Sequence, residues 1–241
     1  MGKAIVCTTC GPDPSRRKAG NSFAGLQDDS DDEEDGMINY RDAVLEAGDA
    51  RLFSVPHWLN DRCLHFGFKL LEDDLGEAGC VLMDPAVYSF MMLQCEDDDE
   101  FEDLGRGLAF ARDKPRVVAT AVSDAEALVV GGSSHWSLLM YHVDDDRAAH
   151  YDSMGSTKNA SSAAKAAKKL ARCFRREAPT LDHAPTPRQT NGHDCGAFAL
   201  AVAGALLRGQ PVADVTPAAV AALRADYRAR ADAMLAKGRS P

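Results

Sequence analysis

The chain has 241 residues, and its hydrophobic content of 45% is enough for a sizeable core in one large domain or two small ones. Its 37 acidic residues outnumber 27 basic ones, and the net charge of −10 argues against generic binding to nucleic acids or anionic membranes. The seven cysteines have no disulfide spacing, and neither a leader peptide nor a membrane span is expected, so we predict a cytoplasmic or nuclear protein.

The N-terminal region is predicted to differ from the rest of the chain. Residues 1–36 are rich in Gly, Pro, Ser and charged side chains, with too little apolar surface to offset the entropy lost on folding. We therefore predict a disordered acidic tail over 1–36 and a single folded domain over 37–241. Within the domain, residues 40–47 are predicted to form a short helix.

Apolar spacing and start signals predict two further helices. Over residues 58–74, apolar side chains recur at i, i+4, i+7 and i+11, as in an amphipathic helix, and they are Leu59, Cys63, Phe66 and Leu70. Asp61 falls in the first turn, where a carboxylate interacts favourably with the helix dipole. After a short strand at 80–83, Pro85 opens the second helix. The acidic residues 96–103 are expected to form a surface loop.

The centre of the chain is rich in predicted strands. β-branched and apolar residues predict strands at 116–122, 135–143, 148–152 and 180–183. A helix rich in Ala and Lys is predicted over 157–176, and Thr216-Pro217 supplies the N-cap and first position of a last helix. Helices at both ends of a mostly antiparallel sheet indicate an α+β fold.

The stretch around Cys195 is the main candidate for chemistry. A polar turn with a glycine precedes this cysteine, and an unbroken apolar run over 197–207 follows it. The run has helical length and composition, so Cys195 is predicted at a helix N-terminus, where the helix dipole stabilises a thiolate. The alternative is a small buried cysteine in a core helix. A metal shared with His193 is disfavoured because the motif offers no further ligands.

A cysteine nucleophile needs a base, and the base needs an orienting group. His135 opens one predicted strand and Asp152 closes the next, and both lie beside loops, where functional residues gather. The parity of the two positions puts them on one face of a hairpin. If the reversal is centred directly after Val143, His135 lies opposite Asp152, roughly 5 Å away. If it is centred two residues later, the pairing slips by roughly 13 Å, and the sequence leaves both registers open.

Acyl transfer also requires hydrogen-bond donors for the developing oxyanion. The backbone amide of Cys195 is one candidate. The side chain of Gln189 is a second candidate, because it lies on the polar turn and can reach the site if the turn folds back. The alternative for Gln189 is a solvated loop position.

Four segments together resemble the ubiquitin-like protein protease family, whose members are cysteine peptidases that mature and remove SUMO- and NEDD-type modifiers. These segments are Trp58-Leu59-Asn60-Asp61, His135-Trp136, Tyr151-Asp152-Ser153 and Gln-x-Asn-Gly-x-Asp-Cys-Gly at 189–196. Within the family, the sequence is most similar to the small deneddylase branch, on the segments 116–118, 131–132, 135–139 and 150–153. The pair Asn191-Gly192 is equally similar to SUMO-directed members.

The resemblance implies a papain-like fold and a set of site residues. It implies Cys195 as nucleophile, His135 as base and acid, Asp152 as the orienting group and Gln189 as part of the oxyanion hole. It further implies that the chain's two tryptophans, Trp58 and Trp136, cover a narrow tunnel that admits only a Gly-Gly tail. Core packing is the alternative for each tryptophan.

The resemblance also implies the partner and the reaction. Asp61 would contact the modifier, with a solvated first-turn carboxylate as the alternative. The predicted activity is that of a thiol isopeptidase that cleaves after the C-terminal Gly-Gly of a ubiquitin-like modifier, preferably of the NEDD type, in deneddylation and precursor processing. The alternatives are a SUMO-specific protease, a catalytically silent module that binds a ubiquitin-like protein, and a deubiquitinase or acetyltransferase on the same scaffold. We expect a monomer without cofactor, metal, nucleic acid or membrane.

Overall fold

The structure is a computed structural model that describes residues 36–76, 79–111, 115–125 and 134–238. The predicted tail, apart from Gly36, lies outside these described residues, and so does the pair Gly131-Gly132. Among the helices that the structure describes, none combines the length and the apolar character that a membrane span requires.

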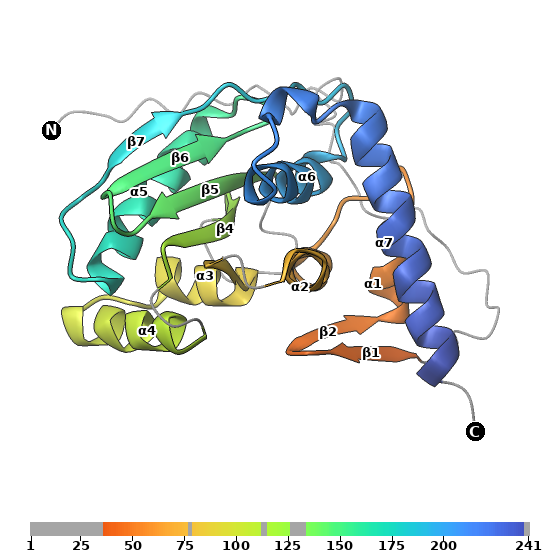
Figure 1. The fold of residues 1–241 in the computed structure, drawn as a ribbon, viewed down its shortest axis with the longest axis horizontal. Coiled ribbons are helices and arrows are strands. Elements are labelled where there is room, and N and C mark those ends of the chain that lie inside the picture. Colours follow the sequence, from red (N-terminus) through yellow and green to blue (C-terminus); the bar gives the residue numbers. More distant parts are fainter. Residues whose placement is uncertain (1–35, 77–78, 112–114, 126–133, 239–241) are drawn as a thin grey trace, which may run out of the picture. The chain divides into compact units, whose positions relative to one another are not determined.

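A five-stranded sheet forms the centre of the domain (Figure 1). Its strands, in spatial order, are β3 (Cys80–Met83), β4 (Val117–Ser123), β5 (Trp136–His142), β6 (Arg147–Tyr151) and β7 (Thr180–His183). The inner pairs β4–β5 and β5–β6 are antiparallel, and the two edge pairs are parallel. Nearly all residues of β4 and most of β5 are buried, as expected for strands covered by helices on both faces.

Two groups of helices cover the two faces of this sheet (Figure 1). The first group is α2 (Asp61–Leu75) and α6 (Cys195–Leu207), and the second is α3 (Pro85–Leu93), α4 (Asp98–Ala111) and α5 (Thr157–Cys173). Successive side chains of a strand point to opposite faces. In β4, Ala119 and Ala121 therefore pack in the core of the first group, and Val118 and Val122 pack in the core of the second. One apolar strand thus serves two cores.

An N-terminal hairpin and the last helix complete the described domain. The hairpin strands β1 (Met37–Tyr40) and β2 (Ala43–Glu46) are followed by α1 (Ala47–Arg51), and the 3-10 helix η1 (Val212–Asp214) precedes α7 (Pro217–Gly238). Helix α7 runs beside α1 and β1 (Figure 1). The prediction of a helix over 40–47 is wrong, because β2 buries alternate residues, Ala43 and Leu45, and Arg41 has a φ of 56° in the turn.

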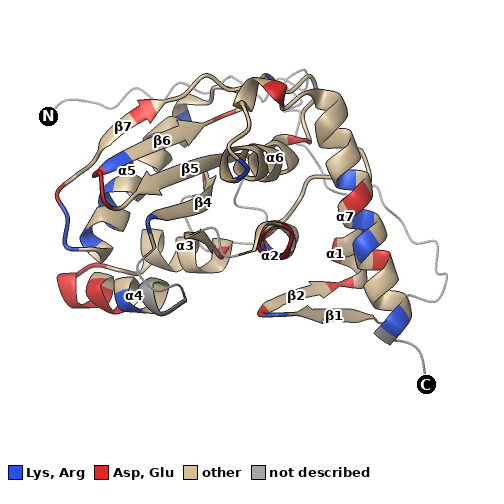
Figure 2. Ribbon diagram, viewed as in Figure 1, with Lys and Arg blue, Asp and Glu red and all other residues tan. Residues whose placement is uncertain are grey.

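The acidic segment 96–103 is also different from the prediction, because most of it belongs to α4 and not to a loop. Asp97 starts this helix, since its Oδ1 accepts the N–H of Glu100 at 3.0 Å. Figure 2 shows acidic residues gathered at the start of α4, where they interact favourably with the helix dipole. The Phe101 ring is buried beneath two cationic side chains of α5. Packing against α5 therefore stabilises helix α4, which its acidic composition alone does not predict.

Side-chain caps start two other predicted helices, and the first of them begins at Asp61, three residues later than the predicted range 58–74. Helix α2 begins after Asn60, whose Oδ1 accepts the N–H of Cys63 at 2.9 Å. Helix α7 begins after Thr216, whose Oγ1 accepts the N–H of Ala219 at 3.2 Å. Both contacts satisfy amide groups that have no partner within the helix, and the predictions of these two helices are confirmed.

The contact between α4 and α5 predicts opposite effects of two glycine substitutions. A Cβ added at Gly105 would lie 1.8 Å from the carbonyl oxygen of Cys173, whereas a Cβ at Gly107 would meet nothing within 4 Å. Gly105→Ala is expected to lower the free energy of unfolding by about 1–3 kcal/mol, since the helices must separate. Gly107→Ala is the matched control and is expected to raise it by roughly 0.5–1 kcal/mol through helix propensity.

Urea unfolding of both variants, followed by circular dichroism, measures the two changes. Equal shifts of the unfolding midpoint for Gly105→Ala and Gly107→Ala would show that α4 does not pack on α5 at this distance.

Candidate active site

Cys195 is the first residue of α6, which agrees with its predicted place at a helix N-terminus, and it is 4% exposed. Its backbone amide has no partner within the helix, and the helix dipole favours negative charge at this end. Gly196 allows the helix start to approach its neighbours, since an added Cβ there would lie 3.1 Å from Cβ of Leu59 and 3.5 Å from Cδ1 of Trp136. The nucleophile candidate therefore lies in a closely packed setting.

The β5–β6 hairpin brings His135 and Asp152 together. Its observed register pairs Leu138 with Tyr151, midway between the two registers considered from the sequence. Continued past the strand ends, this register puts Asp152 opposite Ser137, with His135 two residues farther along the same face. The side chains bridge this diagonal, so that Nε2 of His135 lies 2.7 Å from Oδ1 of Asp152.

His135 and Asp152 form a buried ion pair, with side chains that are 5% and 7% exposed. Burial by itself lowers the pKa of His135, but hydrogen bonds to Asp152 and Cys195 raise the pKa to about 9. Burial likewise raises the pKa of Asp152, but His135 and the N–H groups of Met154 and Ser156 lower the pKa to about 2. Because Nε2 of His135 contacts Asp152, Nδ1 is the ring nitrogen that remains for an interaction with Cys195.

Backbone amides hold the carboxylates on both sides of this pair. Oδ1 of Asp152 accepts the N–H of Met154 at 2.8 Å, and Oδ2 accepts the N–H of Ser156 at 2.6 Å. On the other side, the buried carboxylate of Asp124 accepts the N–H of His135 at 3.1 Å. Sequence reasoning missed Asp124, although its place two residues after a predicted strand is a signal that could have identified it.

Gln189 is hydrogen-bonded to the strand end beside Asp152, so the polar turn folds back toward this strand end. Ser153 donates its hydroxyl to Oε1 of Gln189 at 2.6 Å, and the two backbones are joined by an N–H···O bond of 3.2 Å. Nε2 of Gln189 donates to the carbonyl of Asn191 at 2.6 Å. A side-chain amide carries two N–H groups, and this contact uses one of them. Ser153 and Cys195 line the same narrow crevice.

The two tryptophans lie in different settings. Trp136 lines the crevice at Cys195, and its indole N–H donates to the carbonyl of Leu59 at 2.9 Å, which joins the start of β5 to the segment before α2. Trp58 is 50% exposed, so it is not a core residue. Asp61 is exposed at the start of α2, where its carboxylate accepts the N–H of Arg62. The side chains of Trp58 and Asp61 are thus open to a partner.

Two buried residues at the site received no role from the sequence. Asp194, directly before Cys195, is 6% exposed, and its Oδ1 lies 3.0 Å from Nη1 of Arg224. The position of Asp194 within the cysteine motif is a signal that could have pointed to it. Arg224 lies 30 residues farther along the chain, and no local pattern marks it.

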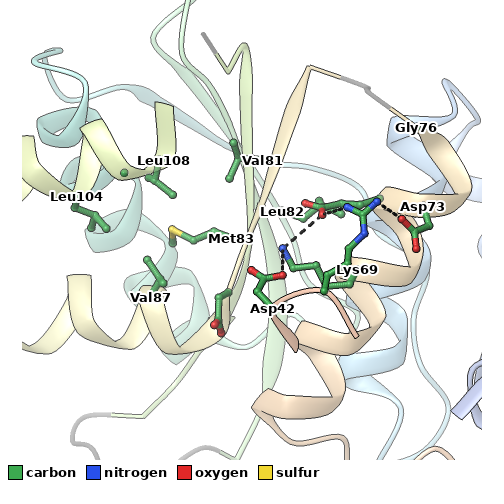
Figure 3. A pocket seen from close by; sticks show the side chains of 14 residues that line it. Asp42, Lys69, Asp73, Gly76, Val81, Leu82, Met83, Val87, Leu104 and Leu108 are labelled. Carbon is green, nitrogen blue, oxygen red and sulfur yellow. Dashed lines mark hydrogen bonds and ion pairs between the residues drawn. The ribbon is translucent and has the colours of Figure 1, made fainter. Parts of the chain in front are cut away.

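Two other observations delimit the site. Within the part of the chain that the structure describes, no group of three or more His, Cys, Asp and Glu side chains could hold a metal ion. A cavity of about 810 Å³ lies among α2, β3 and α4 (Figure 3), with the ion pair Lys69–Asp42 on one side and Leu104 and Leu108 on the other. None of Cys195, His135 or Asp152 lines it, so this cavity is separate from the site.

The sequence is similar to a known protein family and to several known relatives. The family described as "Ulp1 protease family, C-terminal catalytic domain" matches residues 57–238. The chain is 30% identical to NEDD8-specific protease 1 of Arabidopsis thaliana. The aligned 179 residues cover 71% of this chain and 75% of that protein. It is 29% identical over 207 residues to sentrin-specific protease 8 of Mus musculus, covering 80% of this chain and 90% of the relative.

Solved structures have the same fold. The C-terminal Ulp1 protease domain in complex with Smt3, the yeast ortholog of SUMO, matches with a TM-score of 0.66 at 18% identity, over 83% of this chain and 90% of that one. The Xanthomonas campestris effector protein XopD bound to ubiquitin matches with a TM-score of 0.54 at 25% identity, over 72% and 90%. The predicted papain-like α+β fold is confirmed, and the chain belongs to the Ulp1 protease family of cysteine proteases.

Proposed function

We propose that this protein cleaves after the C-terminal Gly-Gly of a ubiquitin-like modifier of the NEDD type, both in conjugates and in precursors. The main support is the hydrogen bond of 2.7 Å between His135 and Asp152. The same imidazole also interacts with Cys195 at the start of α6. The names of the relatives from Arabidopsis thaliana and Mus musculus support the choice of modifier.

The first chemical step is attack by the Cys195 sulfur on the carbonyl carbon of the modifier's terminal glycine. The helix dipole of α6 and the neighbouring imidazolium of His135 both place positive charge beside the attacking sulfur. The attack forms a carbon–sulfur bond and moves negative charge onto the carbonyl oxygen. The backbone amide of Cys195 and the second N–H of Gln189 are the proposed donors to that oxygen.

The leaving amine requires a proton, and His135 supplies it. The carbon–nitrogen bond breaks as Nδ1 of His135 protonates the amine, which leaves a thioester on Cys195. Neutral His135 then removes a proton from water, whose oxygen forms a bond to the thioester carbon. The carbon–sulfur bond breaks, which releases the modifier's C-terminal carboxyl group and returns Cys195 and the protonated His135 to their starting state. Asp152 holds the ring in place and stabilises its charged form throughout both steps.

The two tryptophans provide a reason for a diglycine tail. Trp136 lies at Cys195 and Trp58 is exposed on the segment joined to it through Leu59. We propose that the two rings cover the tail, so that side chains larger than hydrogen are excluded by steric clash. Exclusion of this kind gives more selectivity than contacts with such small residues could give.

Asp152→Asn is expected to shift the pH dependence of catalysis. The pKa of His135 is raised from 6.5 to about 9, so its proton is present at neutral pH and is lost as the pH rises through about 9. We therefore expect kcat/KM to fall above about pH 9 in the unsubstituted protein. Loss of the Asp152 charge should move this fall to lower pH by about one unit or more and reduce kcat by roughly 10²–10⁴-fold.

The measurement is a pH–rate profile on a modifier with a fluorogenic C-terminal amide. Asp182→Asn is the matched control, because Asp182 is an exposed carboxylate at the edge strand that pairs with Arg147. Its profile should coincide with that of the unsubstituted protein. An unshifted profile in Asp152→Asn would mean that Asp152 does not control the protonation of His135.

Modifiers with a C-terminal electrophile test the reaction and its specificity together. We expect the NEDD-type probe to label the protein faster than SUMO or ubiquitin probes, and we expect Cys195→Ala to abolish labelling. Cys173→Ala is the matched control, because Cys173 is buried and its burial raises the pKa of the thiol to about 12. Mass spectrometry of the adduct identifies the labelled residue.

Each other outcome contradicts one part of the proposal. Absence of an adduct with every probe would refute the peptidase activity and favour a silent binding module. Faster labelling by SUMO or ubiquitin would refute the choice of modifier, and an adduct that survives Cys195→Ala would refute the choice of nucleophile.

A further inference from the structure

Arg224 of α7 is a buried cation close to the nucleophile. It is 2% exposed, although arginine side chains are rarely buried without partners. Burial lowers the pKa of Arg224, and the carboxylate of Asp194 counteracts this effect. A charge in such a position requires several hydrogen-bond acceptors, because an unpaired buried charge is strongly destabilising.

The guanidinium bonds to two segments that are far apart in the sequence. Nη1 lies 3.0 Å from Oδ1 of Asp194, directly before Cys195. Nε and Nη2 donate to four backbone carbonyls of the N-terminal segment at 2.6–3.1 Å, those of Phe53, Leu52, Ser54 and His57. The planar fork of an arginine can satisfy acceptors in several directions at once, which a lysine ammonium on a flexible stem cannot reproduce.

The backbone segment whose carbonyls bind Arg224 is connected to both tryptophans. The segment held by Arg224 ends at His57, and Trp58 and Leu59 follow it directly. The carbonyl of Leu59 accepts the indole N–H of Trp136, which adjoins His135. Displacement of this segment would therefore change the positions of both rings that we propose to cover the tail.

The carboxylate of Asp194 is connected through hydrogen bonds to Gln189, the proposed oxyanion donor. Oδ2 of Asp194 accepts a hydrogen bond from Nδ2 of Asn191 at 2.7 Å. Oδ1 of Asn191 accepts the backbone N–H groups of His193 and Asp194, each at 3.0 Å. The carbonyl of Asn191 in turn accepts Nε2 of Gln189 at 2.6 Å. A continuous series of hydrogen bonds thus runs from Arg224 to the side chain of Gln189.

We propose that Arg224 is a positioning residue that holds the cysteine turn, residues 189–195, in register with the tail-covering segment, residues 52–59. It acts through Asp194 on the oxyanion donor and through backbone carbonyls on the tryptophans. This role rests on the function proposed above, since both groups matter only for a substrate whose tail passes between them. Arg224 touches neither the reacting sulfur nor the imidazole in any hydrogen bond of the described residues.

Arg224→Lys is the main test, and two activities of the same cysteine provide the comparison. Hydrolysis of the modifier amide needs Gln189 and the tryptophans, whereas alkylation of Cys195 by iodoacetamide forms no oxyanion. We expect kcat to fall by roughly 10²-fold, because small misplacements of catalytic groups cause losses of about this size. Alkylation should change by less than threefold, because Arg224 makes no hydrogen bond to Cys195 or His135 and lysine keeps the positive charge near the sulfur. Parallel losses of both activities would overturn the proposal.

Arg228→Lys is the matched control for this substitution. Arg228 lies one turn farther along α7, and its Nε bonds to Asp232 within the same helix. Its kcat and alkylation rate should equal those of the unsubstituted protein. Both proteins are assayed at temperatures where circular dichroism shows full folding, and a kcat in folded Arg224→Lys equal to that of the control would also overturn the proposal.

Hydrogen–deuterium exchange of Asp194→Ala keeps the proposal testable if Arg224→Lys does not fold or if no modifier is cleaved. This variant removes the carboxylate and leaves the four carbonyl bonds of Arg224 available. If Arg224 couples the two segments, amide exchange should rise over 189–195 and also over 52–59, while β4 and β5 stay unchanged. A rise confined to 189–195 would overturn the coupling, whereas an uncleaved modifier would refute only the proposed function.

Discussion

The hydrogen bond between His135 and Asp152 depends on the register of one hairpin. Strands β5 and β6 pair so that the two residues lie diagonally on one face just past the strand ends. The amides of Met154 and Ser156 hold the carboxylate, and Asp124 holds the backbone amide of His135. A shift of one residue in this pairing would turn one of the two side chains to the opposite face. The charge state of His135 therefore depends on the geometry of the sheet.

The rest of the fold serves to bring a helix N-terminus to that sheet end. Helix α6 is almost wholly apolar and packs between the sheet and α2, which fixes its axis, while Gly196 allows its first turn to approach Leu59 and Trp136. Buried charges lie on both sides of Cys195, and each has its partner, His135 with Asp152 and Arg224 with Asp194. Paired charges of this kind stay buried because their hydrogen bonds offset much of the cost of desolvation.

Local chemistry explains which elements could be predicted. Helices α2 and α7 begin at side-chain caps within four residues of the amides they bind, and the strands β3 and β7 coincide with the predicted residues. The hairpin β1–β2 and helix α4 could not be predicted in the same way. The hairpin buries alternate residues against α2, and α4 packs Phe101 beneath cations of α5, so distant segments decide both structures.

The sequence by itself determined the reactive residue types and their order, since Cys195, Gln189, His135 and Asp152 all lie in short motifs at element ends. Only the tertiary structure decided the hairpin register, the contact of Gln189 with Ser153, and the burial of Arg224. The reason is physical: the bond from Arg224 to Phe53 joins residues 171 positions apart, and the preferences of neighbouring residues carry no information about such a contact. Motifs therefore identify the candidate residues, and packing decides how they are held.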